Sequence, residues 1–240
     1  MNNKVVLITG SAHGIGRATA IEFAKHGYNV VINYIKAETD ANNLKQELEK
    51  KYNIEAIVCQ ADVSNEDQVK TMIATIVNKW GKIDALVNNA GIVYDGEPFD
   101  NSTVERFQKI LNINLIGAYI VAKNAEPYIS DKGSIVNVSS NDTVAPECMD
   151  YNAAKTGLRS LTRDLAFQFK PRVRVNAVAP GWVDTRFNIN VDKETIESEK
   201  TNIWLERFAQ PEEIAKVIYF LCSEDASYVN GSILTVDGGY

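Results

Sequence analysis

The stretch KVVLITGSAHGIGRATAIEFAKHG, residues 4–27, decides the fold of this 240-residue chain. Residues 4–9 form a short apolar run rich in β-branched side chains, which predicts a fully buried strand. Residues 14–27 then place apolar side chains at helical spacing and end on Gly27, which predicts a helix. A buried strand that leads through a glycine-rich turn into a helix is typical of the first half of a βαβ unit.

The rest of the chain repeats this alternation. Further strands are predicted at 29–33, 55–60, 83–89, 133–140, 173–181 and 232–239. Further helices are predicted at 40–52, 64–81 (with Ser64 as N-cap), 103–126, 151–169, 193–205 and 211–223. Such alternation implies right-handed crossovers and a parallel sheet covered on both faces. We therefore predict the α/β class: one Rossmann-like, doubly wound domain over 1–240, with about seven parallel strands and helices on both faces.

Composition argues against several classes of partner. The net charge of −6 gives no basic footprint for nucleic acid and no attraction to an anionic membrane surface. No apolar run approaches the roughly 20 residues that a membrane-spanning helix needs. The sequence MNNKVVLITG enters a strand directly, without the pattern of a secretory leader. A cytoplasmic location is therefore expected, with neither nucleic acid nor membrane as a partner.

The cysteines do not suggest a metal or a disulfide framework. Cys59, Cys148 and Cys222 are odd in number, widely spaced and without a histidine neighbour, so no metal is predicted. A catalytic thiol at Cys148 is disfavoured because the chain has two histidines, His13 and His26, and neither stands near it in sequence.

The turn TGSAHGIG, residues 9–16, is the first candidate site. In open parallel sheets, ligands bind beyond the carboxyl ends of the strands. Gly10, Gly14 and Gly16 would let the main chain approach a pyrophosphate, and the following helix offers free N–H groups. A glycine pattern alone is a weak signal, but its place after the first strand favours a nucleotide site over a bare structural turn.

The end of the second strand bears on the choice between NAD and NADP. NAD sites usually place an acid there, whereas a 2′-phosphate is favoured by cations. Here Asn33 and Tyr34 occupy the position, Lys36 follows, and His13 lies in the glycine turn. NADP(H) is therefore predicted and NAD(H) stays possible, since Lys36 could also be a solvated surface residue. After the third strand, Asp62 could accept a hydrogen bond from the adenine amino group or cap the next helix.

The stretch VSSNDTVAPECMDYNAAK, residues 138–155, is the candidate catalytic segment. Tyr151 and Lys155 are four residues apart at a predicted helix start and share one face. A nearby ammonium would favour the phenolate and lower the pKa of the tyrosine. Tyr151 could then donate a proton to a carbonyl oxygen, with a serine hydroxyl from the strand end holding that oxygen. A tyrosine and a lysine at this spacing are a weak signal alone. Their place after the fifth strand of a predicted nucleotide-binding sheet favours a catalytic role.

These motifs together resemble the single-domain form of the short-chain dehydrogenase/reductase family. The resemblance spans essentially the whole chain and includes TGSAHGIG, NNAG (88–91), LNINLIGAY, YNAAK, NAVAPGWVDT and the final VDGG. It implies that Tyr151 is the acid/base, that Lys155 binds the ribose hydroxyls and lowers the tyrosine pKa, and that Ser140 binds the substrate oxygen. It also implies that Asn114, rather than Asn112, anchors a water that links the lysine to solvent.

The resemblance also assigns the cofactor contacts. It implies that NNAG closes over the adenosine and ribose, and that residues 180–185 run along the nicotinamide, with Val183 and Thr185 near its carboxamide. The full set of expected cofactor-binding residues is Gly10, His13, Gly14, Ile15, Gly16, Asn33, Tyr34, Lys36, Asp62, Val63, Asn89, Ala90, Gly91, Tyr151, Lys155, Pro180, Gly181, Val183 and Thr185.

The substrate is less defined than the chemistry. The loop from Ser140 to Tyr151 is about two residues shorter than is common in the family, so either its tip is trimmed or Ser139 replaces Ser140. Residues 186–206 are expected to form a substrate lid. The aromatic and aliphatic side chains that could line the pocket are Trp182, Phe187, Ile189 and Trp204.

The overall pattern is most similar to 3-oxoacyl-[acyl-carrier-protein] reductases of fatty acid biosynthesis. An acyl-thioester substrate, with an acyl carrier protein as a possible partner, is therefore expected. Lys170, Arg172 and Arg174 could be the basic docking residues, or merely surface. A sugar, polyol or small ketone is the rival substrate, and a catalytically silent nucleotide-binding protein is the rival class. The resemblance further implies a homotetramer or homodimer formed by the helices at 104–126 and 151–169.

Overall fold

The computed structural model describes residues 4–93, 101–141, 148–186 and 191–240. Within these ranges the chain forms one parallel sheet in the order β3-β2-β1-β4-β5-β6-β7. The strands are β1 (Val5–Ile8), β2 (Asn29–Tyr34), β3 (Ala56–Gln60), β4 (Ile83–Asn88), β5 (Ile129–Val138), β6 (Val173–Pro180) and β7 (Ile233–Val236). The predicted α/β class, the Rossmann-like domain and the seven parallel strands are confirmed.

The strand order reverses beside β1, and this position creates the site. β1 pairs in parallel with β2 on one side and with β4 on the other. The connections after β1 and β4 therefore leave toward opposite faces, and a crevice opens between their carboxyl ends. All four residues of β1 are fully buried, as its unbroken apolar run predicts.

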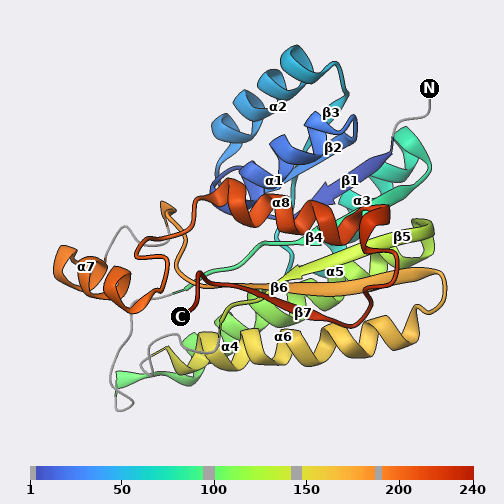
Figure 1. The fold of residues 1–240 in the computed structure, drawn as a ribbon. Helices are drawn as coiled ribbons and strands as arrows, with labels where there is room; N and C mark the ends of the chain where they lie inside the picture. The colour runs from blue at the N-terminus through green and yellow to red at the C-terminus, as the bar shows by residue number, and fades with distance from the viewer. Residues whose placement is uncertain (1–3, 94–100, 142–147, 187–190) are drawn as a thin grey trace.

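Helices cover both faces of the sheet (Figure 1). One face carries α1 (Gly14–Lys25), α2 (Glu38–Tyr52) and α8 (Pro211–Cys222). The other carries α3 (Glu66–Trp80), α5 (Gly117–Ala125) and α6 (Met149–Gln168), each packing apolar side chains on the sheet. The remaining helices are α4 (Val104–Leu111) and α7 (Lys193–Asn202), and α7 stands outside the two layers in Figure 1. None of the helices described is both long and apolar enough to span a bilayer.

The helix predicted over 103–126 is not regular. A π-helical turn, η2 (Asn112–Ile116), separates α4 from α5, and the N–H of Gly117 bonds to the carbonyl of Asn112. A 3-10 turn, η3 (Glu126–Tyr128), follows α5. Single π turns inside α-helices are frequent at functional sites because they locally change which side chains face inward. Here the turn contains Asn114, one of the expected catalytic residues.

The predicted N-cap of α3 is wrong by one residue. Asn65, not Ser64, accepts hydrogen bonds from the N–H groups of Asp67 and Gln68, at 3.1 Å each. The hydroxyl of Ser64 instead donates to Asp62 Oδ1 at 2.7 Å. Asn and Ser are almost equally good N-caps, so sequence preference could not separate neighbours.

Candidate active site

The glycine turn lies at the crevice between β1 and β4. Gly10 and Gly14 have φ angles of 63° and 51°, in the left-handed region that glycine adopts without strain. A Cβ on Gly10 would lie 2.9 Å from the Cα of Ala90, and one on Gly16 would lie 2.5 Å from Asn89 Nδ2. Glycine is therefore required at both positions for the turn to pack against the segment after β4.

The segment after β4 is tied directly to this turn. Thr9 Oγ1 accepts hydrogen bonds from the N–H groups of Asn89 and Ala90, both at 3.0 Å. The Asn89 amide donates to the carbonyls of Thr9 and Gly10 at 2.9 and 3.0 Å. The side chain of Asn89, expected to close over a nucleotide, is thus used to brace the glycine turn. Thr9 is a supporting residue that sequence reasoning missed.

The N-terminus of α1 fits an anion. His13 is the N-cap of this helix and makes no capping hydrogen bond with its side chain, so the first-turn N–H groups near Ile15 have no side-chain acceptor. Together with the tight glycine turn, this arrangement fits the pyrophosphate of a dinucleotide.

The end of β2 differs from the expectation. Asn33 is buried, and its side chain accepts from the N–H of Gly10 at 3.1 Å and donates to the carbonyls of Cys59 and Ala61 at 3.2 and 3.0 Å. Tyr34 is also buried, whereas Lys36 is exposed. Asn33 therefore holds three strand ends together, and sequence alone could not distinguish that use from ribose binding.

A carboxylate that sequence reasoning overlooked lies beside this position. Asp40, in the first turn of α2, forms a 2.5 Å ion pair with His13 Nε2. The hydrogen bond with His13 lowers the pKa of Asp40 below its usual value, so the carboxylate is charged at neutral pH. An acid of this kind is expected at the end of the strand, whereas Asp40 reaches the glycine turn from the following helix.

Asp62 and Val63 follow β3 at the same edge of the sheet. Asp62 Oδ1 accepts from the N–H and hydroxyl of Ser64 at 2.9 and 2.7 Å, which fixes the carboxylate in an Asx turn. The side chain of Val63 packs against Gly117, where an added Cβ would lie at 2.7 Å. Asp62 therefore does not cap α3.

The two candidate serines have different environments. Ser139 Oγ donates to the carbonyl of Lys155 at 2.9 Å and so joins the end of β5 to α6. Ser140 instead forms a side-chain hydrogen bond with Tyr151. The geometry therefore favours Ser140 over Ser139. The short loop predicted between Ser140 and Tyr151 includes residues 142–147, which lie outside the described residues.

Lys155 is buried beneath Tyr151 and close to Asn114. Its Nζ lies 5.5 Å from the centre of the Tyr151 ring and donates to the carbonyl of Val138 at 2.7 Å. Asn114 Nδ2 donates to the carbonyl of Ile92 at 2.7 Å, and its Oδ1 accepts from the Ile92 N–H at 2.8 Å. Asn112 is exposed, so the structure places the expected asparagine, and not its alternative, near the lysine.

Gly91 separates these two side chains. A Cβ at Gly91 would lie 2.8 Å from Asn114 Oδ1 and 3.5 Å from Lys155 Nζ. The last residue of NNAG is therefore a glycine because the side chain of Asn114 leaves no space for a Cβ there.

The pKa values correct one expectation about the pair. Burial raises the pKa of Tyr151 to about 12, although the hydrogen bond with Ser140 acts in the opposite direction. Burial also lowers the pKa of Lys155 to about 8. Desolvation of the phenolate thus outweighs the hydrogen bond with Ser140, and the tyrosine pKa is raised rather than lowered.

Two further side chains, which the sequence did not indicate, hold the serine segment in place. The Arg159 guanidinium, one turn after Lys155 on α6, donates to the carbonyl of Ser140 and, from Nε, to Ser139 Oγ at 3.3 Å. Asn141 Nδ2 donates to Asp237 Oδ2 at 2.7 Å, which connects the segment to the final VDGG. An arginine on a helix and an asparagine in a loop carry no sequence signal for such contacts.

The segment after β6 reaches back to the glycine turn. The N–H of Gly181, next to Pro180, donates to the carbonyl of Val236 at 3.1 Å, and an added Cβ there would lie 2.8 Å from the Cβ of Asp237. Val183 forms a parallel bridge with Ala209. Thr185 lies against Gly14, where an added Cβ would be 3.4 Å from its methyl carbon. Residues expected at the pyrophosphate and at the nicotinamide of a dinucleotide are thus brought to one crevice.

The predicted lid is only partly described. Phe187 and Ile189 lie outside the described residues. Trp182 stacks on Phe208 at 5.2 Å between ring centres and donates to Glu199 Oε2 at 3.0 Å, so its ring packs between the body of the domain and α7. Trp204 is 85% exposed.

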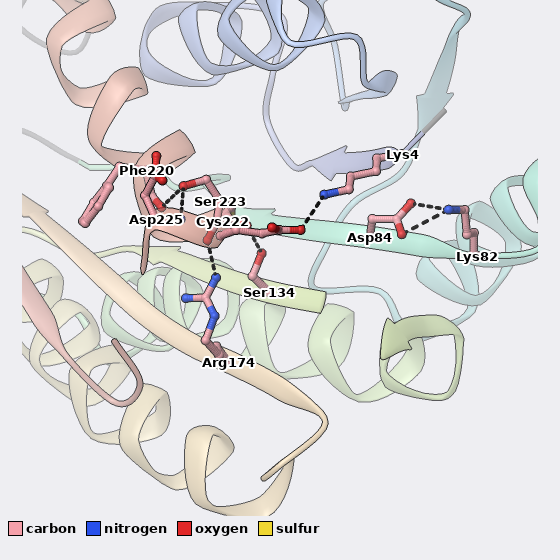
Figure 2. A network of polar contacts seen from close by, with 10 residues as sticks. Lys4, Lys82, Asp84, Ser134, Arg174, Phe220, Cys222, Ser223 and Asp225 are labelled. Carbon is pink, nitrogen blue, oxygen red and sulfur yellow. Dashed lines mark hydrogen bonds and ion pairs between the residues drawn. The ribbon is translucent and has the colours of Figure 1, made fainter. Parts of the chain in front are cut away.

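The basic residues expected at the site mouth lie at the opposite edge of the sheet. β6 runs from Val173 to Pro180, so Arg174 is separated from the site by most of a strand of roughly 23 Å at about 3.3 Å per residue. Arg174 donates to the carbonyls of Leu221, Val229 and Ser223. In Figure 2 it lies in a network that includes Lys4 and Asp84, from the starts of other strands.

Its neighbours Arg172 and Lys170 are no nearer to the site. Arg172 bonds Glu126 and the carbonyl of Ile129, and the Lys170 ammonium lies 3.4 Å from the centre of the Phe167 ring. The three residues therefore do not lie at the mouth of this chain's own site, and carrier docking stays a prediction. A residue's position along its strand decides which edge of the sheet it occupies, and a count of charges does not contain that information.

Comparison with known proteins agrees with this geometry. A family model described as "Enoyl-(Acyl carrier protein) reductase" matches residues 10–240. The chain is 37% identical to a 3-oxoacyl-[acyl-carrier-protein] reductase of Thermotoga maritima over 244 residues, covering 100% of this chain and 98% of the relative. It is 34% identical to glucose 1-dehydrogenase 2 of Bacillus subtilis over 249 residues, covering 100% and 95%.

Solved structures agree as well. A short-chain dehydrogenase of Burkholderia cenocepacia, solved in complex with NADP, superimposes with a TM-score of 0.92 and 29% identity over 98% of this chain and 97% of that one. The family match and the full-length relatives show a nucleotide-dependent oxidoreductase that acts on alcohol and ketone groups. The chain belongs to the short-chain dehydrogenase/reductase family.

Proposed function

We propose that this protein is an NADPH-dependent carbonyl reductase that converts a 3-oxoacyl thioester into the 3-hydroxyacyl product. The observation that carries the reaction type is the meeting of Ser140, Tyr151 and Lys155 beside the glycine turn. The substrate class rests on the 37% identity to a 3-oxoacyl-[acyl-carrier-protein] reductase over the whole chain. An acyl carrier protein is proposed as the carrier of that substrate.

The proposed mechanism assigns one task to each side chain. NADPH, when bound in the crevice beside the glycine turn, would supply the hydride that the carbonyl carbon accepts. Ser140 donates a hydrogen bond to the carbonyl oxygen, and Tyr151 gives that oxygen its proton. With its pKa raised to about 12, Tyr151 carries its proton throughout the neutral range. Lys155 holds the ribose hydroxyls, and its charge favours the phenolate that forms when the proton leaves.

Asn114 has a supporting task in this proposal. Its side chain fixes Ile92 beside the lysine, and the π turn around it changes the local backbone hydrogen-bonding pattern. We propose that a water held here connects Lys155 with solvent, so that Tyr151 regains its proton after each turnover.

Replacement of the tyrosine hydroxyl tests the mechanism. Tyr151→Phe keeps the ring and its packing but removes the proton donor, so kcat/KM for acetoacetyl thioester is expected to fall by about 10²–10⁴-fold. NADPH affinity, measured by quenching of protein fluorescence, should stay within about threefold because the ring remains. Near-native turnover by this variant would refute the mechanism and revive the rival of a silent nucleotide-binding protein.

A sugar or polyol is the second candidate substrate, supported by the 34% identity to glucose 1-dehydrogenase 2 over the whole chain. A substrate panel separates the thioester proposal from the sugar or polyol alternative. It contains acetoacetyl thioester, aldoses and simple ketones, each assayed with NADPH and NADH or with NADP and NAD. A thioester kcat/KM at least tenfold above every sugar supports the proposal. Oxidation of an aldose as the fastest reaction would overturn it in favour of the alternative.

The coenzyme preference is proposed from basic side chains at and near the glycine turn. His13 lies at the N-cap of α1 and Lys36 is exposed after β2, and both could face a 2′-phosphate. The neighbour solved with NADP is similar over nearly its whole length. A kcat/KM for NADH that exceeds the value for NADPH would sink this preference.

We propose that the protein is a homotetramer or homodimer in which a second copy covers the groove between η2, the start of α5 and α6. This open groove of about 330 Å³ is lined by Leu115, Ile116, Tyr119, Gly157, Ser160, Leu161 and Asp164. Ile116 and Tyr119 are 43% and 44% exposed, and such apolar exposure is typical of an interface.

Light scattering at micromolar concentration tests the assembly. Tyr119→Glu should lower the measured mass, whereas Tyr228→Glu, at a fully exposed tyrosine after α8, should leave it unchanged. A monomeric native protein would refute the proposal.

A cytoplasmic location is also proposed. All three cysteines are buried free thiols, which suits a reducing compartment.

A further inference from the structure

Charged groups from separate elements meet beside the glycine turn. Asp40 Oδ2, on the first turn of α2, lies 2.5 Å from His13 Nε2 and 3.8 Å from a guanidinium nitrogen of Arg186. Arg17, on α1, also acts on the Asp40 carboxylate through its charge. The side chains of His13, Asp40 and Arg186 are 36%, 45% and 73% exposed, so the cluster remains open to a ligand from solvent.

The cluster lies where the proposed nucleotide would carry its phosphates. His13 immediately precedes Gly14 at the N-terminus of α1, and Arg186 follows Thr185, which packs against Gly14. Asp40 therefore links α2, the glycine turn and the segment after β6 across one side of the crevice. Asn33 and Tyr34, at the end of β2, are buried, and the Asp40 carboxylate approaches this side of the crevice from α2.

We propose that Asp40 is a coenzyme-selectivity residue that holds His13 and Arg186 in the place of a 2′-phosphate and so limits the preference for NADPH over NADH. This inference rests on the proposed nucleotide site but not on which coenzyme the native protein prefers. A 2′-phosphate must displace the carboxylate from His13 and also meets its negative charge. A ribose 2′-hydroxyl meets neither obstacle, because it is neutral and can donate a hydrogen bond to a carboxylate.

Nucleotide fragments test the inference by binding alone. Isothermal titration calorimetry gives the affinities of 2′,5′-ADP, which carries the 2′-phosphate, and of 5′-AMP, which lacks it. Asp40→Asn removes one negative charge beside a phosphate dianion in a water-exposed site, so it should raise the 2′,5′-ADP/5′-AMP affinity ratio by about tenfold. The kcat/KM ratio for NADPH over NADH should rise in parallel.

Glu38→Gln is the matched control. Glu38 is exposed in the same first turn of α2, so this variant makes the same change in net charge and in the helix-terminus charge. It should change the fragment ratio by less than about twofold, because Asp40, and not Glu38, contacts His13 and because salt screens an exposed charge. His13→Gln should lower 2′,5′-ADP affinity severalfold and leave 5′-AMP affinity unchanged.

The outcomes separate this inference from the coenzyme proposal. A native protein that prefers NADH would refute the NADPH proposal, yet a ratio raised in Asp40→Asn would still support the role of Asp40. A ratio unchanged in Asp40→Asn, or raised equally in Glu38→Gln, would overturn the inference. So would His13→Gln with native affinity for 2′,5′-ADP, since the phosphate would then not meet the cluster.

Discussion

Raising the pH from 7 to 9 removes one proton from the pair formed by Tyr151 and Lys155. Burial places the pKa of Lys155 at about 8 and that of Tyr151 at about 12, so the first proton leaves near pH 8. In the proposed reduction, the phenol gives up a proton while the ammonium stabilises the phenolate. Only the doubly protonated pair can therefore complete the step, whichever atom loses the first proton.

The magnitude follows from the lysine pKa. With a pKa of about 8, the pair is about nine-tenths doubly protonated at pH 7 and about one-tenth at pH 9. Reductive kcat/KM should therefore fall about tenfold over this range. Oxidation of the alcohol should rise by a similar factor, because the singly protonated pair can place its proton on the lysine and leave a phenolate as base.

The assay follows initial rates by the change in nicotinamide absorbance at pH 6–10. The coenzyme concentration is varied at saturating second substrate to give kcat/KM for the coenzyme, because the pH dependence of this parameter reports ionisable groups of the free protein. Lys155→Met is the control: its activity should be low, and the break near pH 8 should vanish from the activity that remains. The requirement for a doubly protonated pair would be refuted if kcat/KM of the native protein did not change through pH 8. It would also be refuted if kcat/KM fell with rising pH for both reduction and oxidation.

Three substitutions test the supports of the site. Gly91→Ala should lower kcat/KM at least tenfold, because its Cβ would lie 2.8 Å from Asn114 Oδ1 and displace the lysine beside it. Arg159→Met should lower kcat about tenfold with NADPH affinity kept, because the serine segment loses its guanidinium contacts while the glycine turn is untouched. Thr9→Val should lower the free energy of unfolding in urea by about 1–3 kcal/mol, because two N–H groups after β4 lose their acceptor.

Each of these substitutions has a control variant or an outcome that would contradict its explanation. Arg163→Met, at an exposed position on α6, should leave kcat unchanged, and an equal loss in both arginine variants would point to a general effect on the helix. For Gly91→Ala, native activity with an unchanged NADPH affinity would show that the lysine has more room than the structure indicates. For Thr9→Val, an unfolding free energy equal to that of the native protein would contradict the bracing role.

Local pattern was sufficient for the fold. The buried run of β1, the glycine turn and the helical spacing of α1 each follow from interactions between near neighbours in sequence, and the repeat of this unit implies a parallel sheet. The pairing of Tyr151 with Lys155 was likewise visible, since residues four apart share one face of a helix. The position of both within a nucleotide-binding sheet gave the pair its meaning.

Long-range packing decided what individual polar residues do. Asn33 and Asn89 look like ligand-binding residues in sequence, but their amides are used by main-chain groups of neighbouring strands and turns. Ser139 and Ser140 are adjacent, and only their different partners on α6 distinguish them. The Ser139 hydroxyl bonds the main chain of Lys155, whereas the Ser140 hydroxyl bonds the side chain of Tyr151. Hydrogen bonds between distant segments leave no periodic trace in the chain, so these assignments required coordinates.

The sequence by itself determined that this chain is a doubly wound domain with a tyrosine and a lysine placed for carbonyl chemistry, because spacing and hydrophobicity act locally. Only the tertiary structure shows that Asp40 contacts His13 and that Gly91 lies between Asn114 and Lys155. It also shows that Arg174 lies at the edge of the sheet opposite the site. It also reversed the expected shift in the tyrosine pKa. That reversal depends on burial, a property of the packed molecule that no short stretch of residues possesses.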